Sequence, residues 1–340
     1  MSFGVALFAL MAVWSLMTPL FSGPDEPSNF VRSAAVVRGE WVGDNVLPAP
    51  LKSYWTTTVN IDPQFGAANN IPWCFAPFSD RPGCGSRLED TQVTDIPAWT
   101  NMGRYPIASF FISGIGTVFG AQDLSVRAAR LMMSLACALL IAVSVAAMKR
   151  RATSSIGLLL AMLPGTVFLA STMNPSALEI CAAIALWTIM PSVIAHDRTR
   201  FDVLAFGVAG ALLILTRAIG PVLYALVIAL SYVATKQRRP LVVIAQQFRN
   251  ALAIHGAAVL FAGWWYLKIY SFQTNNVLSE GIPSISLRSQ IDGAVRHIPI
   301  LLDQAVGNFG WLDAPMPRVA LYIIVALYCV VLARGIVVSS

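Results

Sequence analysis

Eight runs of apolar residues dominate this sequence, and most are long enough to cross a lipid bilayer as a helix. They are 14 to 22 residues long, and about 20 helical residues span the hydrocarbon core. Charged residues make up only 12% of the 340 residues, about half the share found in soluble domains. Soluble enzymes, nucleic-acid-binding proteins and secreted disulfide scaffolds are therefore excluded. We predict an all-α polytopic membrane protein, one transmembrane domain over residues 1–340, with about eight spans at 3–21, 131–148, 156–173, 177–195, 203–216, 218–234, 251–272 and 319–333.

The distribution of charge along the chain predicts its orientation. Short loops between spans carry clusters of Lys and Arg, whereas the long loop 22–123 holds ten of the seventeen carboxylates and the loop 273–318 holds four more. Basic loops stay in the cytoplasm, so the net charge of +6 matters less than its position. We expect a multi-pass protein of the bacterial plasma membrane with both termini cytoplasmic and both long loops outside. The basic clusters are Lys149 to Arg151, Arg198 with Arg200, and Lys236, Arg238 and Arg239 with Arg249.

Three apolar segments need a separate interpretation. The stretch 106–119 is about 21 Å long as a helix, too short for a span, so we expect it to lie at the outer interface. The run 203–234 lies between two cytoplasmic loops and must form two short helices that turn near Arg217, which places Arg217 near the outer leaflet. The first span lacks a basic start and a clear small-residue cleavage site before Pro24, so we expect it to remain as a helix rather than to be cleaved as a signal peptide.

The first outer loop is rich in proline, glycine and aromatic residues, which predicts an ordered cap of short helices and turns. Cys74 and Cys84 lie in this loop, and an oxidising compartment favours a disulfide between them. A metal pair is the alternative, but no histidine lies nearby. The aromatic residues either anchor the cap at the membrane surface or form a platform for sugar rings: Trp41, Tyr54, Trp55, Phe65, Trp73, Phe75, Phe78, Trp99 and Tyr105.

Two adjacent carboxylates, Asp25 and Glu26, follow the first span directly and are framed by Pro24 and Pro27. They have two interpretations. Acidic residues suit the first turn of a short helix over 30–39, where they oppose the positive end of its dipole. Alternatively, they supply a general base at the membrane surface. Residues that are adjacent on an extended chain point to opposite sides, so both carboxylates are not expected to reach one hydroxyl.

These features together resemble a known class of enzyme. The acidic pair, Tyr105-Pro106, the Arg127 and Arg130 pair and the Asn174-Pro175 turn resemble the C-type integral-membrane glycosyltransferases, which use polyprenyl-phosphate sugars. More narrowly, the PDEP loop (24–27), the NPS turn (174–176) and the FGWLDAPMP segment (309–317) are similar to a family of predicted bacterial membrane proteins. That family usually has His at position 29 and Asp at position 176, where this chain has Asn and Ser. Its members are generally longer, so we expect further helices in relatives.

The resemblance implies an inverting hexosyl or pentosyl transferase, with its site on the outer face, that moves sugar from a polyprenyl-phosphate donor to an envelope glycan, lipid or protein. Asp25 would be the catalytic base, and Glu26 would orient it or bind a divalent cation; no cofactor is certain. Arg217 is the first candidate for binding the donor phosphate, because an intramembrane Arg is costly unless used, and Lys268 is the second. A possible acceptor or second acidic site comprises Asn174, Glu179, Trp311 and Asp313.

Two other function classes remain open. A transporter or flippase of lipid-linked glycans would place polar residues or broken helices at mid-membrane in both halves, whereas the acidic residues here gather in the outer loops. A noncatalytic envelope-assembly subunit is the third reading, because Ser176 replaces the expected acid. No phosphate-binding glycine motif occurs, so a cytoplasmic nucleotide site is not expected, and nucleic acid is not an expected partner.

Overall fold

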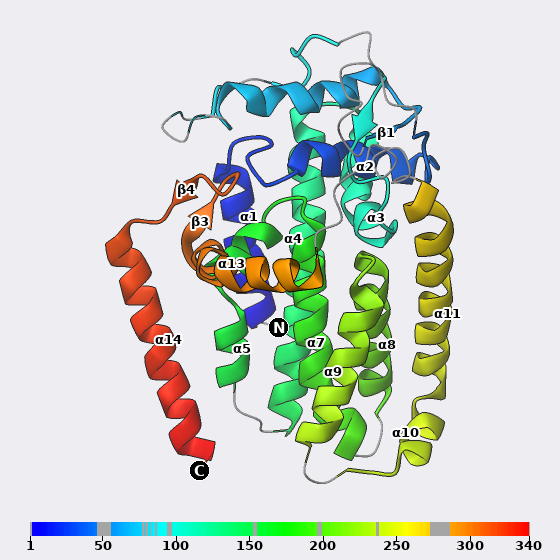
Figure 1. Ribbon diagram of the computed structural model, residues 1–340, viewed down its shortest axis with the longest axis vertical. Coiled ribbons are helices and arrows are strands. Elements are labelled where there is room, and N and C mark those ends of the chain that lie inside the picture. Colours follow the sequence, from blue (N-terminus) through cyan, green and yellow to red (C-terminus); the bar gives the residue numbers. More distant parts are fainter. Residues whose placement is uncertain are drawn as a thin grey trace.

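The computed structural model describes residues 2–45, 56–76, 78, 81, 83–85, 87–93, 97–151, 155–195, 199–235, 238–272 and 286–339. It is 73% helical, which confirms the predicted helical class. Six helices run roughly side by side along the long axis (Figure 1): α1 (Ser2–Met17), α4 (Asp123–Arg151), α7 (Pro175–Ala195), α8 (Arg200–Thr216), α9 (Gly220–Ala234) and α11 (Arg249–Trp265). Helix α7 is the most central, packed against α4, α8 and α9.

Within the described residues, three helical segments are long and apolar enough to cross a membrane: α4, α7 and the segment 249–270, where α11 continues into the π-helical turn η4 (Tyr266–Tyr270). The apolar helices 3–17, 108–119 and 220–234 are shorter. The eight predicted apolar runs are helical for most of their length, but a count of eight membrane spans is not confirmed.

The predicted span 156–173 is not one continuous helix. It divides into α5 (Ile156–Ala161) and α6 (Pro164–Ala170). Pro164 has no amide hydrogen to donate, and the residue before a proline is pushed out of the helical region; Leu163 is accordingly extended, with φ −65° and ψ 153°. This break is a local consequence of one proline.

The turn predicted near Arg217 is confirmed. Helix α8 ends at Thr216, Arg217 adopts an extended backbone, and α9 begins at Gly220. Below this turn, the buried His255 of α11 ties the three helices together. Its Nε2 lies 3.1 Å from the Phe206 carbonyl and its Nδ1 lies 2.8 Å from the Tyr224 hydroxyl. Gly210 leaves room for the imidazole, since a Cβ there would be 2.3 Å from Nε2.

Residues 18–122, which we call the cap, cover one end of this bundle (Figure 1). As predicted, the described part of the cap consists of short elements: α2 (Glu26–Val37), β1 (Thr57–Thr58) paired antiparallel with β2 (Trp99–Thr100), the 3-10 helix η2 (Pro63–Cys74), α3 (Ala108–Gly114) and η3 (Ile115–Phe119). Cys74 and Cys84 form the expected disulfide. Tyr54 and Trp55 of the predicted aromatic platform lie outside the described residues.

The C-terminal part packs on the α5 and α6 side of the bundle. Helix α13 (Leu287–Gly307) lies across α6, and α14 (Arg318–Ser339) contacts α5. Between them, β3 (Asn308–Phe309) and β4 (Ala314–Pro315) form a hairpin. The Phe309 ring lies edge-on to Trp14 and to Phe168, with centroids 5.4 Å apart in each case, so this hairpin rests on α1 and α6.

The last turn of α4 and the first turn of α8, which carry described residues of the basic clusters, lie at the end opposite the cap (Figure 1). The Arg150 Nη2 donates to the Thr199 hydroxyl at 3.0 Å, and Arg151 lies 3.6 Å from Asp202. The short helix α10 (Leu241–Gln247) is also at this end. Arg198 and Lys236 lie outside the described residues. One end of the bundle is therefore basic, and the cap at the other end carries carboxylates. This is the difference in charge from which we predicted the orientation of the chain in the membrane.

Candidate functional site

The two carboxylates of the PDEP loop face different environments. Asp25 is the residue before the first turn of α2, and its side chain is exposed. Glu26 is fully buried. Asp25 has a left-handed backbone, with φ 57° and ψ 12°, and its side chain does not cap the helix. The helix-cap interpretation therefore does not explain this carboxylate, and a left-handed non-glycine residue often marks a functional position.

Glu26 is held by an ion pair with Arg130 of α4. The Nε and Nη2 atoms of Arg130 donate to the two carboxylate oxygens at 2.7 Å each, and both side chains are 0% exposed. The same carboxylate accepts the backbone N–H groups of Gly23 and Met173, each at 3.1 Å. Four charge-assisted hydrogen bonds thus offset the cost of burying the charge.

Arg130 also holds the end of the first helix. Its Nη1 donates to the carbonyls of Ser15 and Thr18 at 2.9 Å, and its Nη2 donates to the Pro19 carbonyl at 2.7 Å. One turn earlier, Arg127 donates to the Leu16 carbonyl. Because the last carbonyls of a helix lack partners within it, these arginines cap α1. The Glu26–Arg130 pair therefore joins α1, the PDEP loop, α4 and the start of α7.

Asp25 lies beside two cations. Desolvation by the surrounding protein raises its pKa above the usual range, while the positive charges of Arg217 and Arg104 partly oppose that shift. The side chain is exposed to solvent, and the neighbouring protein atoms are what raises its pKa. A carboxylate whose pKa is raised is a stronger base, as long as the pH keeps it ionised.

Arg217 joins Asp25 to a second carboxylate. Its Nε lies 3.8 Å from Oε2 of Glu179 in α7, and its guanidinium carbon lies 5.5 Å from the centroid of the Tyr105 ring. Within the described residues the guanidinium makes no hydrogen bond, and its buried Nε has the Glu179 carboxylate as an ion-pair partner but no hydrogen-bond partner. Donors that are positively charged and unused are suited to an anionic ligand.

Arg104 contributes the second cation. Its guanidinium carbon lies 5.1 Å from the centroid of the Tyr105 ring, and its Nη2 is 3.3 Å from the Tyr105 hydroxyl. The indole N–H of Trp265 donates to the Arg104 carbonyl at 3.1 Å, which fixes this backbone against α11. We call Asp25, Arg104, Tyr105, Glu179 and Arg217 the acid–arginine cluster.

Other predicted site residues have different surroundings. Asn174 accepts from the Ser176 N–H at 2.9 Å and donates to the Pro24 carbonyl at 3.4 Å, so it caps α7 and braces the PDEP loop. Lys268 is exposed in η4 and forms no ion pair or hydrogen bond within the described residues. His196 lies outside the described residues, and that part of the chain contains no group of three metal-binding side chains.

Trp311 and Asp313 lie at the tip of the β3–β4 hairpin. The indole N–H of Trp311 donates to the Phe21 carbonyl at 3.0 Å, and Asp313 accepts the Trp311 backbone N–H at 2.8 Å. Both residues line a cavity of about 290 Å³ between the hairpin, the end of α1 and the disulfide loop. Phe75, Phe78 and Arg81 line its other side.

Sequence reasoning did not find two features of this site. Arg104 was not singled out, although an arginine beside Tyr105-Pro106 in an acidic outer loop is a usable signal. The partner of Glu26 was also missed: Arg130 is 104 positions away, and only its i, i+3 spacing with Arg127 marked a shared helical face. Asn29 is buried, and within the described residues neither of its side-chain amide atoms has a hydrogen-bond partner.

A family model described as a predicted membrane protein, DUF2142, matches residues 8–340. The match includes every residue of the acid–arginine cluster, the Glu26–Arg130 pair and the hairpin cavity. No curated protein and no solved structure matches the chain significantly.

Proposed function

The chain belongs to the DUF2142 family of predicted membrane proteins, and from this premise we propose that it is a membrane glycosyltransferase. It moves a hexosyl or pentosyl group from a polyprenyl-phosphate donor to a hydroxyl of an envelope glycan, lipid or protein. The reaction takes place at the cap, on the outer face of a bacterial plasma membrane.

One observation carries this proposal: Asp25 is an exposed carboxylate with a raised pKa that lies beside Arg217 and Arg104. A glycosyl transfer from a lipid phosphate needs these two functions together, a base for the acceptor and cations for the phosphate. The buried Glu26–Arg130 pair next to Asp25 supports the arrangement, because it fixes the loop that carries the base. In this proposal Glu26 is a positioning residue.

The proposed reaction is a single displacement. The acceptor oxygen attacks the anomeric carbon while its proton passes to a carboxylate oxygen of Asp25. The bond between the anomeric carbon and the phosphate oxygen breaks, and its electron pair leaves with the polyprenyl phosphate. The sugar is transferred with inversion. General-base assistance of this kind contributes about 10² to 10⁴-fold.

The cations act on the leaving group. Polyprenyl phosphate gains a negative charge as the sugar leaves, and Arg217 and Arg104 can stabilise that charge more strongly in the transition state than in the bound donor. Glu179 lies beside Arg217 and keeps the guanidinium in place before the donor arrives. Lys268 is a weaker candidate for the phosphate, since no contact joins it to the acid–arginine cluster within the described residues.

The hairpin cavity is the proposed site for the acceptor. One of its lining residues, Ser22, lies three positions before Asp25 in the sequence. Aromatic faces, here Phe78 and Trp311, pack against the apolar faces of sugar rings, while Arg81 and the free oxygen of Asp313 can bind hydroxyl groups. Its volume of about 290 Å³ is at the lower end for ligand pockets, which fits one sugar unit.

A transfer assay tests the proposal. Protein reconstituted in vesicles is mixed with labelled polyprenyl-phosphate sugars and envelope glycans, and labelled product is measured. Asp25→Asn should reduce turnover at least ~10²-fold, with donor binding retained. Asp90→Asn is the matched control, because Asp90 is also an exposed acid of the cap but is not in the acid–arginine cluster.

Two outcomes would overturn the proposal. Near wild-type turnover by Asp25→Asn would move the base elsewhere, with Glu179 and Asp313 the next carboxylates to test. Binding of a lipid-linked glycan without any transfer, but with movement between leaflets, would make the protein a transporter. Binding with neither transfer nor movement would favour an assembly subunit.

A further inference from the structure

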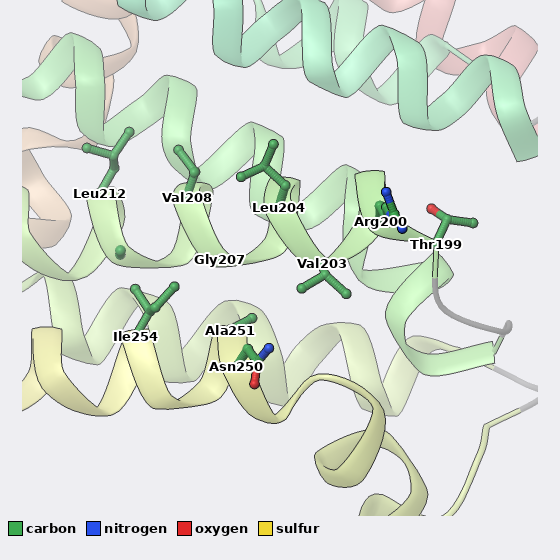
Figure 2. Close-up of a pocket in the computed structure, with 11 residues that line it drawn as sticks. Thr199, Arg200, Val203, Leu204, Gly207, Val208, Leu212, Asn250, Ala251 and Ile254 are labelled. Atoms are coloured by element: carbon green, nitrogen blue, oxygen red, sulfur yellow. The ribbon is translucent and has the colours of Figure 1, made fainter.

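A groove runs along the outer side of α8 and α11, in the half of the bundle that carries the basic clusters (Figure 2). Its volume is about 600 Å³. The two helices are in close contact at its floor, since a Cβ on Gly207 would lie 3.5 Å from the Ala251 Cβ. Apolar side chains line most of its length, Thr199 and Arg200 lie at one end, and Asn250 lies farther along the groove beside Ala251.

The apolar side chains of the groove are exposed. Leu204 is 67% exposed, Val208 46% and Ile254 53%. On a helix that packs inside a bilayer, such side chains contact lipid. The groove extends from Arg200 to Leu212, about 18 Å of helix at 1.5 Å per residue. Half of a ~30 Å hydrocarbon core is about 15 Å, so the groove has the length of one leaflet.

The polar end can bind an anion. Arg200 is exposed, and within the described residues its side chain forms no hydrogen bond or ion pair. The neighbouring Thr199 hydroxyl is already used, because it donates to Asp202 at 2.7 Å and accepts from Arg150 at 3.0 Å. Asp202, the nearby described carboxylate, is buried and faces Arg151, and Arg200 is the one charged side chain among the described residues that line the groove.

We propose that this groove binds one anionic phospholipid of the leaflet on the basic side. One acyl chain lies along Leu204, Val208 and Ile254, and the phosphate is bound by the Arg200 guanidinium. A polar head at the groove mouth and an apolar channel one leaflet deep match the two parts of such a lipid. The inference does not depend on the transferase proposal, because the acid–arginine cluster is at the opposite end of the bundle.

Native mass spectrometry of the full chain tests this assignment, with phosphatidylglycerol and phosphatidylcholine of identical acyl chains as probes. The wild-type protein should bind phosphatidylglycerol about fivefold more tightly, the effect expected of one basic residue near an anionic headgroup. Arg200→Gln should bring the two affinities close together. Val208→Trp and Leu204→Trp, which fill the groove from exposed positions, should weaken the binding of both lipids.

Two matched variants serve as controls. Arg238→Gln removes an exposed arginine at the same end, and Leu226→Trp adds an indole at an exposed apolar position of α9 outside the groove; both should bind lipid like the wild type. Equal wild-type affinity for the two lipids would overturn the proposal, as would phosphatidylglycerol binding that survives both Arg200→Gln and Val208→Trp. Displacement of phosphatidylglycerol by a polyprenyl phosphate, unaffected by Arg200→Gln, would assign the groove to a prenyl chain instead.

Discussion

Arg130 and Glu26 form a fully buried, bidentate ion pair that joins the fourth helix to the loop after the first. The two hydrogen bonds of this pair are both 2.7 Å long. The Arg130 guanidinium also donates hydrogen bonds to carbonyl groups near the end of α1. Within the described residues the adjacent Asp25 forms no hydrogen bond or ion pair through its side chain, so the two acids differ in their surroundings: Glu26 is buried and paired, whereas Asp25 is exposed.

We therefore expect Glu26→Gln to destabilise the protein rather than to affect the reaction selectively. Loss of one charge leaves the Arg130 cation buried and unpaired, which typically costs about 3 to 5 kcal/mol. Thermal unfolding in detergent should show a clearly lower Tm for Glu26→Gln, and Asp25→Asn should unfold close to the wild-type temperature.

The double variant Glu26→Gln with Arg130→Met tests whether the loss of stability in Glu26→Gln comes from the unpaired Arg130 cation. If the cost comes from the unpaired cation, removal of both charges should recover part of the stability lost in Glu26→Gln. A wild-type Tm for Glu26→Gln alone would contradict the importance that we assign to this ion pair.

Local patterns in the sequence predicted local structure well. The turn at Arg217 and the disulfide between Cys74 and Cys84 were expected. A short helix after the acid pair was also expected, but over 30–39, whereas α2 covers Glu26–Val37. Each depends on residues close together in the chain: an apolar run, uncharged except for Arg217, that is too long for one crossing, a proline-framed acid pair, and two cysteines in one loop.

Contacts between distant residues could not be predicted in the same way. The pairing of Glu26 with Arg130 depends on how α1, α4 and α7 pack against one another. The apolar periodicity of a sequence predicts which face of a helix is buried, but it does not predict which other helix packs against that face. The same applies to Arg104, whose charge acts on Asp25 and whose carbonyl accepts a hydrogen bond from the Trp265 indole of α11. The break before Pro164 was, in contrast, a local signal that the length of the apolar run obscured.

Arg217→Ala should weaken binding of a polyprenyl phosphate about tenfold or more, since a charged hydrogen bond contributes about 1.5 to 3 kcal/mol. Arg217→Lys should be only partly tolerated, because lysine keeps the charge but loses the bidentate geometry. Binding is measured by displacement of a fluorescent prenyl phosphate. Arg81→Ala, in the hairpin cavity, is the control and should bind the donor normally. Unchanged affinity in Arg217→Ala would remove it from the phosphate site.

Asn29 offers a test in which stability and activity should change in opposite directions. Its buried amide has no partner within the described residues, and a buried polar group without a hydrogen bond costs about 1 to 3 kcal/mol. Asn29→Leu should therefore raise the Tm. If the amide serves a bound substrate or water, turnover in the transfer assay should fall in the same variant. A higher Tm with full turnover would show that Asn29 has no part in the reaction.

Gly210 should tolerate no side chain while His255 is present. A Cβ at this position would lie 2.3 Å from Nε2 of the imidazole, and the ring is confined by Phe206 and Tyr224, with centroids 4.6 Å and 5.0 Å away. Gly210→Ala should cost about 1 to 3 kcal/mol through overpacking. The cost should shrink in a His255→Ala background, which a double-mutant cycle of unfolding free energies measures. Equal costs in both backgrounds would contradict the predicted clash.

The pH dependence of transfer gives the most direct test of the acid–arginine cluster. Asp25 must be ionised to accept a proton, so turnover should fall as the pH drops through its pKa, and this acidic limb should lie above the range of an ordinary aspartate because desolvation raises that pKa. Arg217 and Arg104 lower the pKa, so Arg217→Gln and Arg104→Gln should each move the limb to higher pH, with Arg217→Gln moving it further. Arg81→Gln should leave it in place. The profile is measured as kcat/KM for the donor, which reports ionisation of the free enzyme. An acidic limb that neither arginine variant moves would mean that the titrating base is not Asp25.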